Sequence, residues 1–240
     1  MSKVAAIITA GGIGARTGLE IPKQFVVVEG KPVVVHTLEV FDAHPEIDMI
    51  CVPCLAGWEK KLENDAKKFG ISKLKLIVQG GETGFLSIRN ALFALEHYLD
   101  DKDIVMVHDG IRPLVSKRLI SDNLALCRAK GNAVAVVDCL ETMLQVDCAD
   151  SAFSQTSLNK DLIKRAQAPQ SLTFGEFMAL HREAQQNNIT DAVATSALLT
   201  ALGRRVWIHR GDEKNIKITH MHDIEFFRKI LALRHAEGQF

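Results

Sequence analysis

A glycine-rich segment followed by two cationic residues is the first place in the sequence where side chains could do chemistry. Ala10-Gly11-Gly12-Ile13-Gly14-Ala15-Arg16 comes directly after an apolar run with the length of a strand, and Lys23 lies shortly beyond it. Glycines at such a turn let backbone N–H groups approach a phosphate closely. Arg16 and Lys23 would add positive charge there. The segment favours a polyphosphate site and phosphoryl or nucleotidyl transfer, in which positioning and charge neutralisation dominate catalysis.

This segment also has a plainer interpretation. It lacks the third glycine of the dinucleotide-binding fingerprint, because Ala15, Arg16 and Thr17 follow Gly14. It also lacks the Gly-Lys-Ser/Thr of a P-loop. A tight strand–helix turn with solvated surface cations would explain these residues without a ligand.

Three further segments carry residues suited to a phosphate site. His108-Asp109-Gly110-Ile111-Arg112-Pro113 follows an apolar run at 104–107. If that run is a strand, Asp109 lies at its carboxyl end, where ligands of open α/β sheets gather and where it could hold Mg²⁺ bound to a triphosphate. An aspartate that only caps a turn is the alternative. Gln79-Gly80-Gly81-Glu82-Thr83 follows another apolar run, and Lys214-Asn215-Ile216-Lys217-Ile218-Thr219 offers a late lysine.

Strands that alternate with helices would bring these segments together. The apolar patterns predict strands at 4–9, 49–53, 74–78, 104–107, 133–137 and 205–209. They predict helices at 32–41, 58–69, 88–99, 117–130 with Ser116 as N-cap, near 173–187, at 191–202 and from about 222 to 235. This alternation implies an α/β fold whose mostly parallel sheet is covered on both faces, with right-handed crossovers. Residues 139–170 are polar and interrupt the alternation. We expect one domain over 1–240, with an arm inserted at about 139–165.

Composition and charge exclude several classes of protein. The chain has 240 residues, 47% of them hydrophobic, and its 29 Lys and Arg balance 29 Asp and Glu. It is therefore globular rather than disordered, and zero net charge argues against a nucleic-acid binder. No segment approaches the roughly 20 apolar residues of a membrane span, and the N-terminus lacks a signal-peptide pattern. The five cysteines are odd in number and mostly lie in apolar segments. The cysteines are expected to be core thiols, which indicates a cytoplasmic protein. We also expect that the protein binds neither membrane nor nucleic acid.

Seven short blocks, in a fixed order along nearly the whole chain, resemble one family. They are Gly11-Gly12-x-Gly14-x-Arg16, Pro22-Lys23-Gln24-Phe25, Gly80-Gly81 with Ser87-Ile88, His108-Asp109-x-x-Arg112-Pro113, Ala168-Pro169-Gln170, Thr190-Asp191 and Asn215-Ile216-Lys217-Ile218-Thr219. The family is that of the polyol-phosphate cytidylyltransferases: the methylerythritol-phosphate enzyme of isoprenoid synthesis and the ribitol-phosphate enzymes of cell-envelope polymer synthesis.

The resemblance implies a fold and a reaction. The fold is a Rossmann-like three-layer sandwich with a protruding β-arm for dimerisation. CTP and a polyol phosphate would give a CDP-polyol and pyrophosphate, with Mg²⁺ as cofactor. In the family the arm is exchanged across a two-fold axis, which implies a homodimer.

The resemblance also implies roles for individual residues. Arg16, Lys23 and Lys217 would be catalytic, with the first two stabilising the charge on the α-phosphate and Lys217 binding phosphate. Asp109 would hold the metal and help to place the incoming phosphate. The implied nucleotide-binding residues are Ala10, Gly11, Gly12, Gly14, Gly81, Glu82, Ser87 and Asp109. The implied acceptor-binding residues are Asp109, Arg112, Thr142, Lys160, Thr190 and Lys217, with Thr142 and Lys160 serving the partner's site.

Three departures from the family pattern bear on the acceptor. Gly84 and Lys160 stand where arginine is common, and Ala168 stands where threonine is usual. Lysine keeps the charge of arginine but loses its bidentate fork. These changes leave Arg16, Lys23 and Asp109 untouched. They favour ribitol 5-phosphate or a related envelope polyol phosphate as the acceptor over 2-C-methyl-D-erythritol 4-phosphate.

Other functions remain open from the sequence. The glycine segment and Pro22-Lys23 also resemble sugar-phosphate and molybdopterin-type nucleotidyltransferases, although the blocks around Asp109 and Lys217 do not. A non-catalytic nucleotide-binding module on the same fold is a third hypothesis. The histidines receive no catalytic role, and His220-Met221-His222 at the start of the last helix is not expected to bind a metal.

Overall fold

The computed structural model describes residues 2–12 and 21–236, and a seven-stranded sheet forms its centre. The sheet order is β11-β7-β10-β6-β1-β4-β5, and every neighbouring pair is parallel except those that β10 makes with β6 and β7. The strands are β1 (Val4–Thr9), β4 (Met49–Cys54), β5 (Leu74–Gln79), β6 (Ile104–Asp109), β7 (Asn132–Asp138), β10 (Lys164–Thr173) and β11 (Ile208–Arg210).

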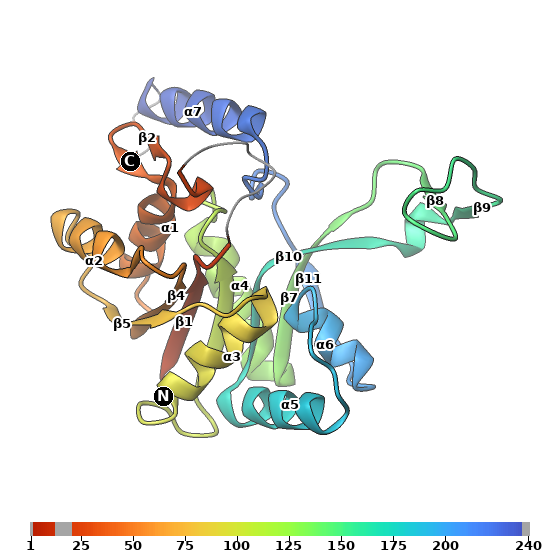
Figure 1. Cartoon of the computed structure of the whole chain (residues 1–240), viewed down its shortest axis with the longest axis horizontal. Coiled ribbons are helices and arrows are strands. Elements are labelled where there is room, and N and C mark those ends of the chain that lie inside the picture. Colours follow the sequence, from red (N-terminus) through yellow and green to blue (C-terminus); the bar gives the residue numbers. More distant parts are fainter. Residues whose placement is uncertain (1, 13–20, 237–240) are drawn as a thin grey trace.

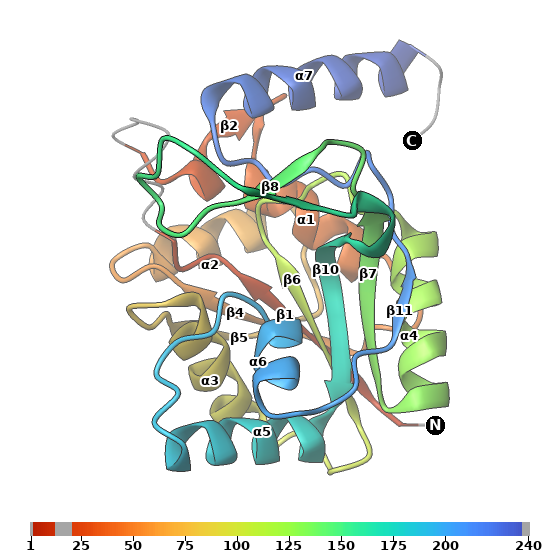
Figure 2. The ribbon, with the colours of Figure 1, turned by 90° about the vertical axis from the view of Figure 1, so that its right-hand side faces the viewer.

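Helices cover both faces of this sheet, as Figures 1 and 2 show. One face packs against α1 (Val33–Asp42), α2 (Glu59–Lys68) and α4 (Lys117–Lys130). The other packs against α3 (Gly84–Leu95), α5 (Phe174–Gln186) and α6 (Thr195–Ala201). Side chains alternate between the faces of a strand, so Ala6 and Ile8 of β1 enter the first core while Ala5 and Ile7 enter the second. A strand buried on both sides explains why the run at 4–9 is continuously apolar.

A third apolar cluster fixes the last helix, α7 (Met221–Ala236), across the end of the sheet (Figure 1). Ile224 and Phe227 of α7 are fully buried against Val28 and Ile111. Val28 belongs to a short ribbon of β2 (Val27–Val28) and β3 (Lys31–Pro32), which the sequence patterns missed. The segment between β11 and α7 thereby lies beside the residues that follow β6.

The predicted α/β class and mostly parallel sheet are confirmed, and residues 139–170, whose polar pattern interrupts the predicted alternation, include the start of a central strand that the patterns did not predict. β10 begins at Lys164 and lies between β6 and β7. Its first residues are exposed and polar, and Pro169 falls inside it, at an irregularity between Gln167 and Gln170. Proline is rare in a central strand, so a pattern of polar residues around a proline concealed this element.

Several element ends also differ from the prediction. The helix expected at 88–99 begins at Gly84 and ends at Leu95, and Thr83 caps it by accepting a hydrogen bond from Leu86 N at 3.2 Å. The helix expected at 191–202 begins only at Thr195, and the last strand is Ile208–Arg210 rather than 205–209.

A two-stranded arm projects from the body of the molecule (Figure 1). It consists of β8 (Met143–Gln145) paired antiparallel with β9 (Thr156–Leu158), and the short 3-10 turn η3 (Lys160–Leu162) leads back to β10. The arm exposes large apolar side chains at Leu140, Leu144, Phe153 and Leu162. Across residues 2–12 and 21–236, no helix combines the length and apolar character needed to cross a bilayer.

The buried cysteines behave as core thiols. Cys51, Cys54, Cys127 and Cys139 are buried, Cys148 in the arm is exposed, and all five are unpaired in disulfides. Burial raises the pKa of Cys51, Cys54 and Cys127 to about 12, so these three groups stay protonated at neutral pH.

Candidate active site

A cavity of about 520 Å³ opens at the carboxyl edge of the sheet. Its walls come from the ends of β1 and β6, from the segments that follow β1 and β5, from the irregular part of β10, and from residues 192–195 and Lys217. Segments that lie far apart in the sequence therefore meet at one edge, as expected for parallel strands of an open α/β sheet.

Two glycine segments form one wall through close backbone packing. A Cβ atom on Gly80 would lie 3.0 Å from Cys54 O and 3.3 Å from Gly11 Cα, and one on Gly11 would lie 3.1 Å from Ser87 Oγ. A Cβ atom on Gly81 would lie only 2.4 Å from Leu86 Cβ. Glycine is needed here because two chain segments touch at backbone distance.

Gln24 holds the first glycine segment in place. Its side-chain amide is almost fully buried and donates to Ala10 O at 2.8 Å and to Gly12 O at 2.9 Å. Sequence analysis gave this residue no role. Its place in the block Pro22-Lys23-Gln24-Phe25 was a signal that could have indicated it, and the structure places it beside the fully buried Phe25 in the short 3-10 helix η2 (Lys23–Phe25).

Ser87 fixes the second glycine segment. Its buried hydroxyl accepts a hydrogen bond from Gly81 N at 3.0 Å and lies 2.9 Å from Thr83 O, to which it can donate. Ser87, Gly81 and Glu82 all line the cavity, as do Ala10, Gly11 and Gly12. Because the Ser87 hydroxyl already bonds the backbone, the structure gives it a role in shaping this wall.

Asp109 lies at the centre of a charged cluster. Its Oδ2 accepts from Arg112 Nε at 2.8 Å, and its Oδ1 lies 3.2 Å from Lys217 Nζ. Burial would raise the pKa of Asp109, but the charges of Lys217 and then Arg112 outweigh this effect and lower the pKa to about 2. Asp109 is therefore a carboxylate at neutral pH, with two cations beside it inside the cavity.

Backbone contacts hold these two cations over Asp109. Arg112 Nη1 donates to Asn215 O at 2.8 Å, while the fully buried Asn215 side chain donates to Ala168 O at 2.7 Å. Ile218 N donates to Ile111 O at 2.9 Å. The segment that carries Lys217 is thus tied both to β10 and to the turn after β6.

The structure places the remaining predicted residues as follows. Lys23 is buried and lines the cavity. Gly14 and Arg16 lie outside the described residues. Thr142 and Lys160 are exposed on the arm and do not line the cavity of their own chain, and Lys160 Nζ donates to Leu140 O at 3.2 Å. The roles assigned to all these residues stay predictions.

The cavity is also lined by residues to which sequence analysis gave no role. Thr190 is exposed and outside the lining, whereas Thr195 is buried and inside it. Gln170 also lines the cavity, and its Oε1 accepts from Ser196 N at 2.8 Å. Gln167 binds both Asp212 N and Asp212 O through its amide. Both glutamines lie at the irregular part of β10, a strand that the apolar patterns did not predict. Gln170 belongs to one of the sequence blocks, but neither glutamine received a role there.

The donor set at Asp109 fits Mg²⁺. This ion binds oxygen, and in nucleotide sites it takes one or two carboxylates and completes its shell with phosphate oxygens and water. Asp109 supplies one ionised carboxylate that faces the cavity. Lys217 reaches it from a flexible side chain that is 41% exposed, so this contact can exchange for others.

Comparisons with known proteins point to one family. The sequence profile described as IspD, 2-C-methyl-D-erythritol 4-phosphate cytidylyltransferase, matches residues 4–232. The ribitol-5-phosphate cytidylyltransferase of Lacticaseibacillus paracasei is 36% identical over 230 residues, which cover 95% of this chain and 97% of that protein. The 2-C-methyl-D-erythritol 4-phosphate cytidylyltransferase of Clostridium tetani is 34% identical over 226 residues, which cover 94% of this chain and 89% of that protein.

A solved structure agrees with these similarities. The 2-C-methyl-D-erythritol 4-phosphate cytidylyltransferase of Francisella tularensis matches with a TM-score of 0.79 and 29% identity, over 94% of this chain and 98% of that one. The Rossmann-like fold expected from the sequence blocks is thereby confirmed. Because the family profile and the relatives both match nearly the whole chain, the chain belongs to the IspD family of cytidylyltransferases.

Proposed function

We propose that this chain transfers the cytidylyl group of CTP to ribitol 5-phosphate, or to a closely related envelope polyol phosphate, and releases pyrophosphate. The observation that carries the proposal is the cluster of Asp109, Arg112 and Lys217 in a cavity that two glycine segments also line. Such a cavity offers backbone N–H groups and cations to a triphosphate. The similarity to proteins named ribitol-5-phosphate cytidylyltransferase supports the choice of acceptor.

The reaction is an in-line displacement. A phosphate oxygen of the acceptor attacks the α-phosphorus of CTP, and the bond between that phosphorus and the oxygen bridging to the β-phosphate breaks. Lys23 would lie beside the negative charge that develops on the α-phosphate, and Arg16 is expected to join it. Lys217 and Arg112 would hold the incoming phosphate. Preorganised cations of this kind stabilise the transition state more than the ground state.

Mg²⁺ is part of the proposal. When bound, it would neutralise phosphate charge and orient the triphosphate. Asp109 would hold it, while Lys217 exchanges its contact with Asp109 for one with phosphate. Gly81 and Glu82 would contact the cytidine, on a wall that Ser87 keeps in shape.

A homodimer in the cytoplasm is the proposed working form. Thr142 and Lys160 lie on an arm that keeps them away from the cavity of the same chain, so they would reach the acceptor only in a partner's cavity. The exposed apolar side chains of the arm, Leu140, Leu144, Phe153 and Leu162, would be covered in such an exchange.

The cysteines support the cytoplasm as the proposed compartment. Buried thiols without disulfides are typical of a reducing compartment.

2-C-methyl-D-erythritol 4-phosphate is the alternative acceptor, supported by the relative from Clostridium tetani. Pyrophosphate release from CTP and Mg²⁺, measured with each polyol phosphate in turn, tests the whole proposal. We expect release that requires an acceptor, and faster release with ribitol 5-phosphate. CTP binding without release for any acceptor would contradict the proposal and would favour a non-catalytic nucleotide module.

A further inference from the structure

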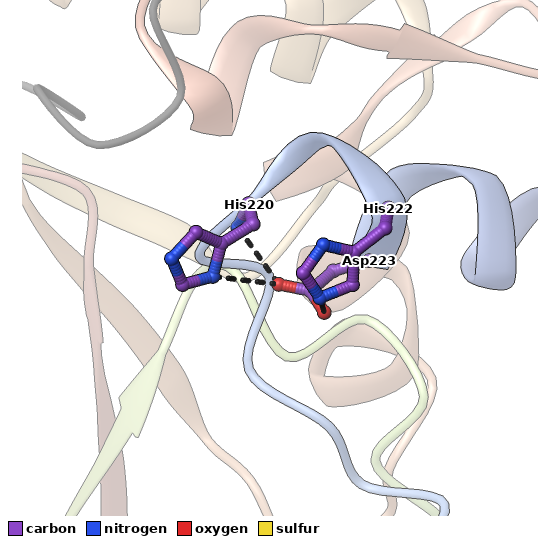
Figure 3. A group of neighbouring side chains, drawn as sticks. All are labelled: His220, His222 and Asp223. Atoms are coloured by element: carbon purple, nitrogen blue, oxygen red, sulfur yellow. Dashed lines mark hydrogen bonds and ion pairs between the residues drawn. The ribbon is translucent and has the colours of Figure 1, made fainter.

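Two histidines and an aspartate gather where the chain enters α7, outside the cavity lining (Figure 3). His220 Nδ1 lies 3.8 Å from Asp223 Oδ2, and His222 Nε2 lies 3.2 Å from Asp223 Oδ1. The two imidazole rings are nearly parallel, with centroids 5.3 Å apart. Within the described part of the chain, this is the group of three His, Cys, Asp or Glu side chains in which one possible ligand atom of each residue lies within 4.8 Å of the other two.

The two distances from the imidazoles to Asp223 are close to those between neighbouring ligands of one metal ion. Zinc binds imidazole nitrogen and carboxylate oxygen at about 2.0–2.2 Å in a tetrahedral arrangement, which places neighbouring ligand atoms about 3.3 Å apart. The observed 3.2 Å and 3.8 Å lie on either side of this value. The two contacts use different oxygens of Asp223, and His220 Nδ1 also lies 2.9 Å from Thr219 Oγ1. Side-chain rotations that replace the contact with Thr219 would bring all three groups onto one ion.

The carboxylate is already oriented by hydrogen bonds. Asp223 Oδ2 accepts from Thr219 N at 2.7 Å, from His220 N at 2.8 Å and from Thr219 Oγ1 at 3.0 Å. Partners of this kind hold metal ligands in place and raise metal affinity. Oδ1 makes its contact with His222 alone among the described residues. Capping of α7 thus accounts for one carboxylate oxygen and leaves the other turned toward an imidazole.

We propose that His220, His222 and Asp223 bind one zinc ion, with water in the fourth position. Imidazole ligands select zinc-type ions, whereas the lone carboxylate of Asp109 suits Mg²⁺, so the two sites differ in chemistry. This proposal does not rest on the proposed function. Sequence analysis gave His220 and His222 no ligand role. The structure adds a third possible ligand, the adjacent carboxylate of Asp223.

Zinc at this site would join the start of α7 to the segment before it. Asp223 already bonds Thr219, and Ile218 of the same segment bonds Ile111 beside the active-site cavity. An ion that binds the folded protein and not the unfolded chain raises stability by mass action. We therefore expect zinc to raise the melting temperature.

The test is zinc titration of the untagged, metal-stripped full chain by calorimetry, together with thermal melts. The variants are His220→Ala and His222→Ala, with His97→Ala as a matched control because His97 is exposed in the turn after α3, away from α7. The His222 side chain is 77% exposed, so its removal should leave the fold intact. Asp109→Asn tests whether the zinc observed belongs to the active-site cavity.

We expect one zinc per chain in the wild type, the His97 variant and the Asp109 variant, with a matching rise in melting temperature. His220→Ala and His222→Ala should each weaken zinc binding by at least about tenfold. Even the loss of a residue that only hydrogen-bonds to a metal ligand costs about 10–100-fold in metal affinity. Equal zinc affinity in the wild type and both variants would overturn the proposal, as would loss of binding in Asp109→Asn alone. The three side chains would then be an N-terminal cap of α7 with a neighbouring histidine contact.

Discussion

Lys217 Nζ lies 3.2 Å from Asp109 Oδ1, although the two residues are 108 positions apart in the sequence. β6 brings Asp109 to the edge of the sheet, and the segment before α7 brings Lys217 across that edge. Lys217 is the largest charge effect that lowers the pKa of Asp109, ahead of Arg112. The pair keeps an ionised carboxylate and an ammonium group together in one cavity, where the proposed function would place a metal-bound triphosphate.

Replacement of Lys217 by methionine should lower turnover strongly. The variant keeps the length of the side chain and loses the charge that would contact phosphate. Loss of one preorganised donor to a developing charge costs about 10²–10³ in turnover in other enzymes. Steady-state pyrophosphate release measures the effect. Lys214→Met is the matched control, because Lys214 is exposed and lies outside the cavity lining. Near-normal turnover in Lys217→Met would remove Lys217 from the mechanism.

Replacement of Gln24 by glutamate should disturb the first glycine segment. The carboxylate has no N–H to donate and would face Ala10 O and Gly12 O. Ala10 O also accepts from Leu55 N, so the loss falls mainly on Gly12. Unmet buried hydrogen bonds cost about 1–3 kcal/mol.

We expect a lower free energy of unfolding for Gln24→Glu in urea, and a KM for CTP raised by at least about tenfold, which corresponds to about 1.4 kcal/mol. Gln186→Glu on the exposed side of α5 should change neither quantity. An unchanged KM for CTP in the Gln24 variant would show that CTP binding does not depend on the hydrogen bonds from Gln24 to the glycine segment.

Two glycines of the second segment should respond differently to alanine. A Cβ atom on Gly81 would meet Leu86 Cβ at 2.4 Å and backbone atoms near 3.0 Å, whereas one on Gly84 meets nothing within 4 Å. Overpacking of this kind costs about 1–3 kcal/mol. Gly81→Ala should therefore lower both stability and CTP affinity. Gly84→Ala should leave CTP affinity unchanged and keep or raise stability, because alanine favours the helix that begins there. Equal effects of the two changes on urea midpoints would contradict the geometry of this wall.

His181 should make stability depend on pH. Burial lowers its pKa, with a further contribution from the charge of Arg89, from 6.5 to about 4. Between these two pKa values the unfolded chain binds the additional proton, so the free energy of unfolding falls as pH falls through this range. One such group changes stability by up to about 1.4 kcal/mol per pH unit.

The variant His181→Phe removes this titration and keeps an aromatic ring against Phe85, whose centroid is 4.6 Å away. Urea unfolding near pH 7 and near pH 5 should show a smaller loss of stability in this variant than in the wild type. The exposed His97→Phe should retain the wild-type loss. An identical loss in His181→Phe would mean that His181 does not titrate in this range.

The sequence predicted the parts of this molecule in which local pattern and tertiary role agree. The apolar run of β1 is buried on both faces, and Asp109 is the last residue of β6, which ends at the cavity. Charged residues near strand ends could therefore be placed correctly from strand topology alone.

The elements that were missed depend on tertiary contacts. β10 is polar in its first half and contains Pro169, so its central position follows from pairing with β6 and β7 rather than from its own composition. Gln24 acts through hydrogen bonds to carbonyl groups of another segment, and no pattern in the sequence identifies those partners. Thr195 lines the cavity at the start of α6, after residues 187–194, which form neither helix nor strand and therefore carry no periodic pattern that would place it.

The most direct test of the central claim is the ratio of kcat/KM for two acceptors, with CTP and Mg²⁺ saturating and pyrophosphate release as the readout. The proposed function predicts a clearly higher value for ribitol 5-phosphate than for 2-C-methyl-D-erythritol 4-phosphate, with the matching CDP-polyol as product. A higher value for 2-C-methyl-D-erythritol 4-phosphate would contradict the assignment of the acceptor, and no release with either acceptor would contradict the assigned activity.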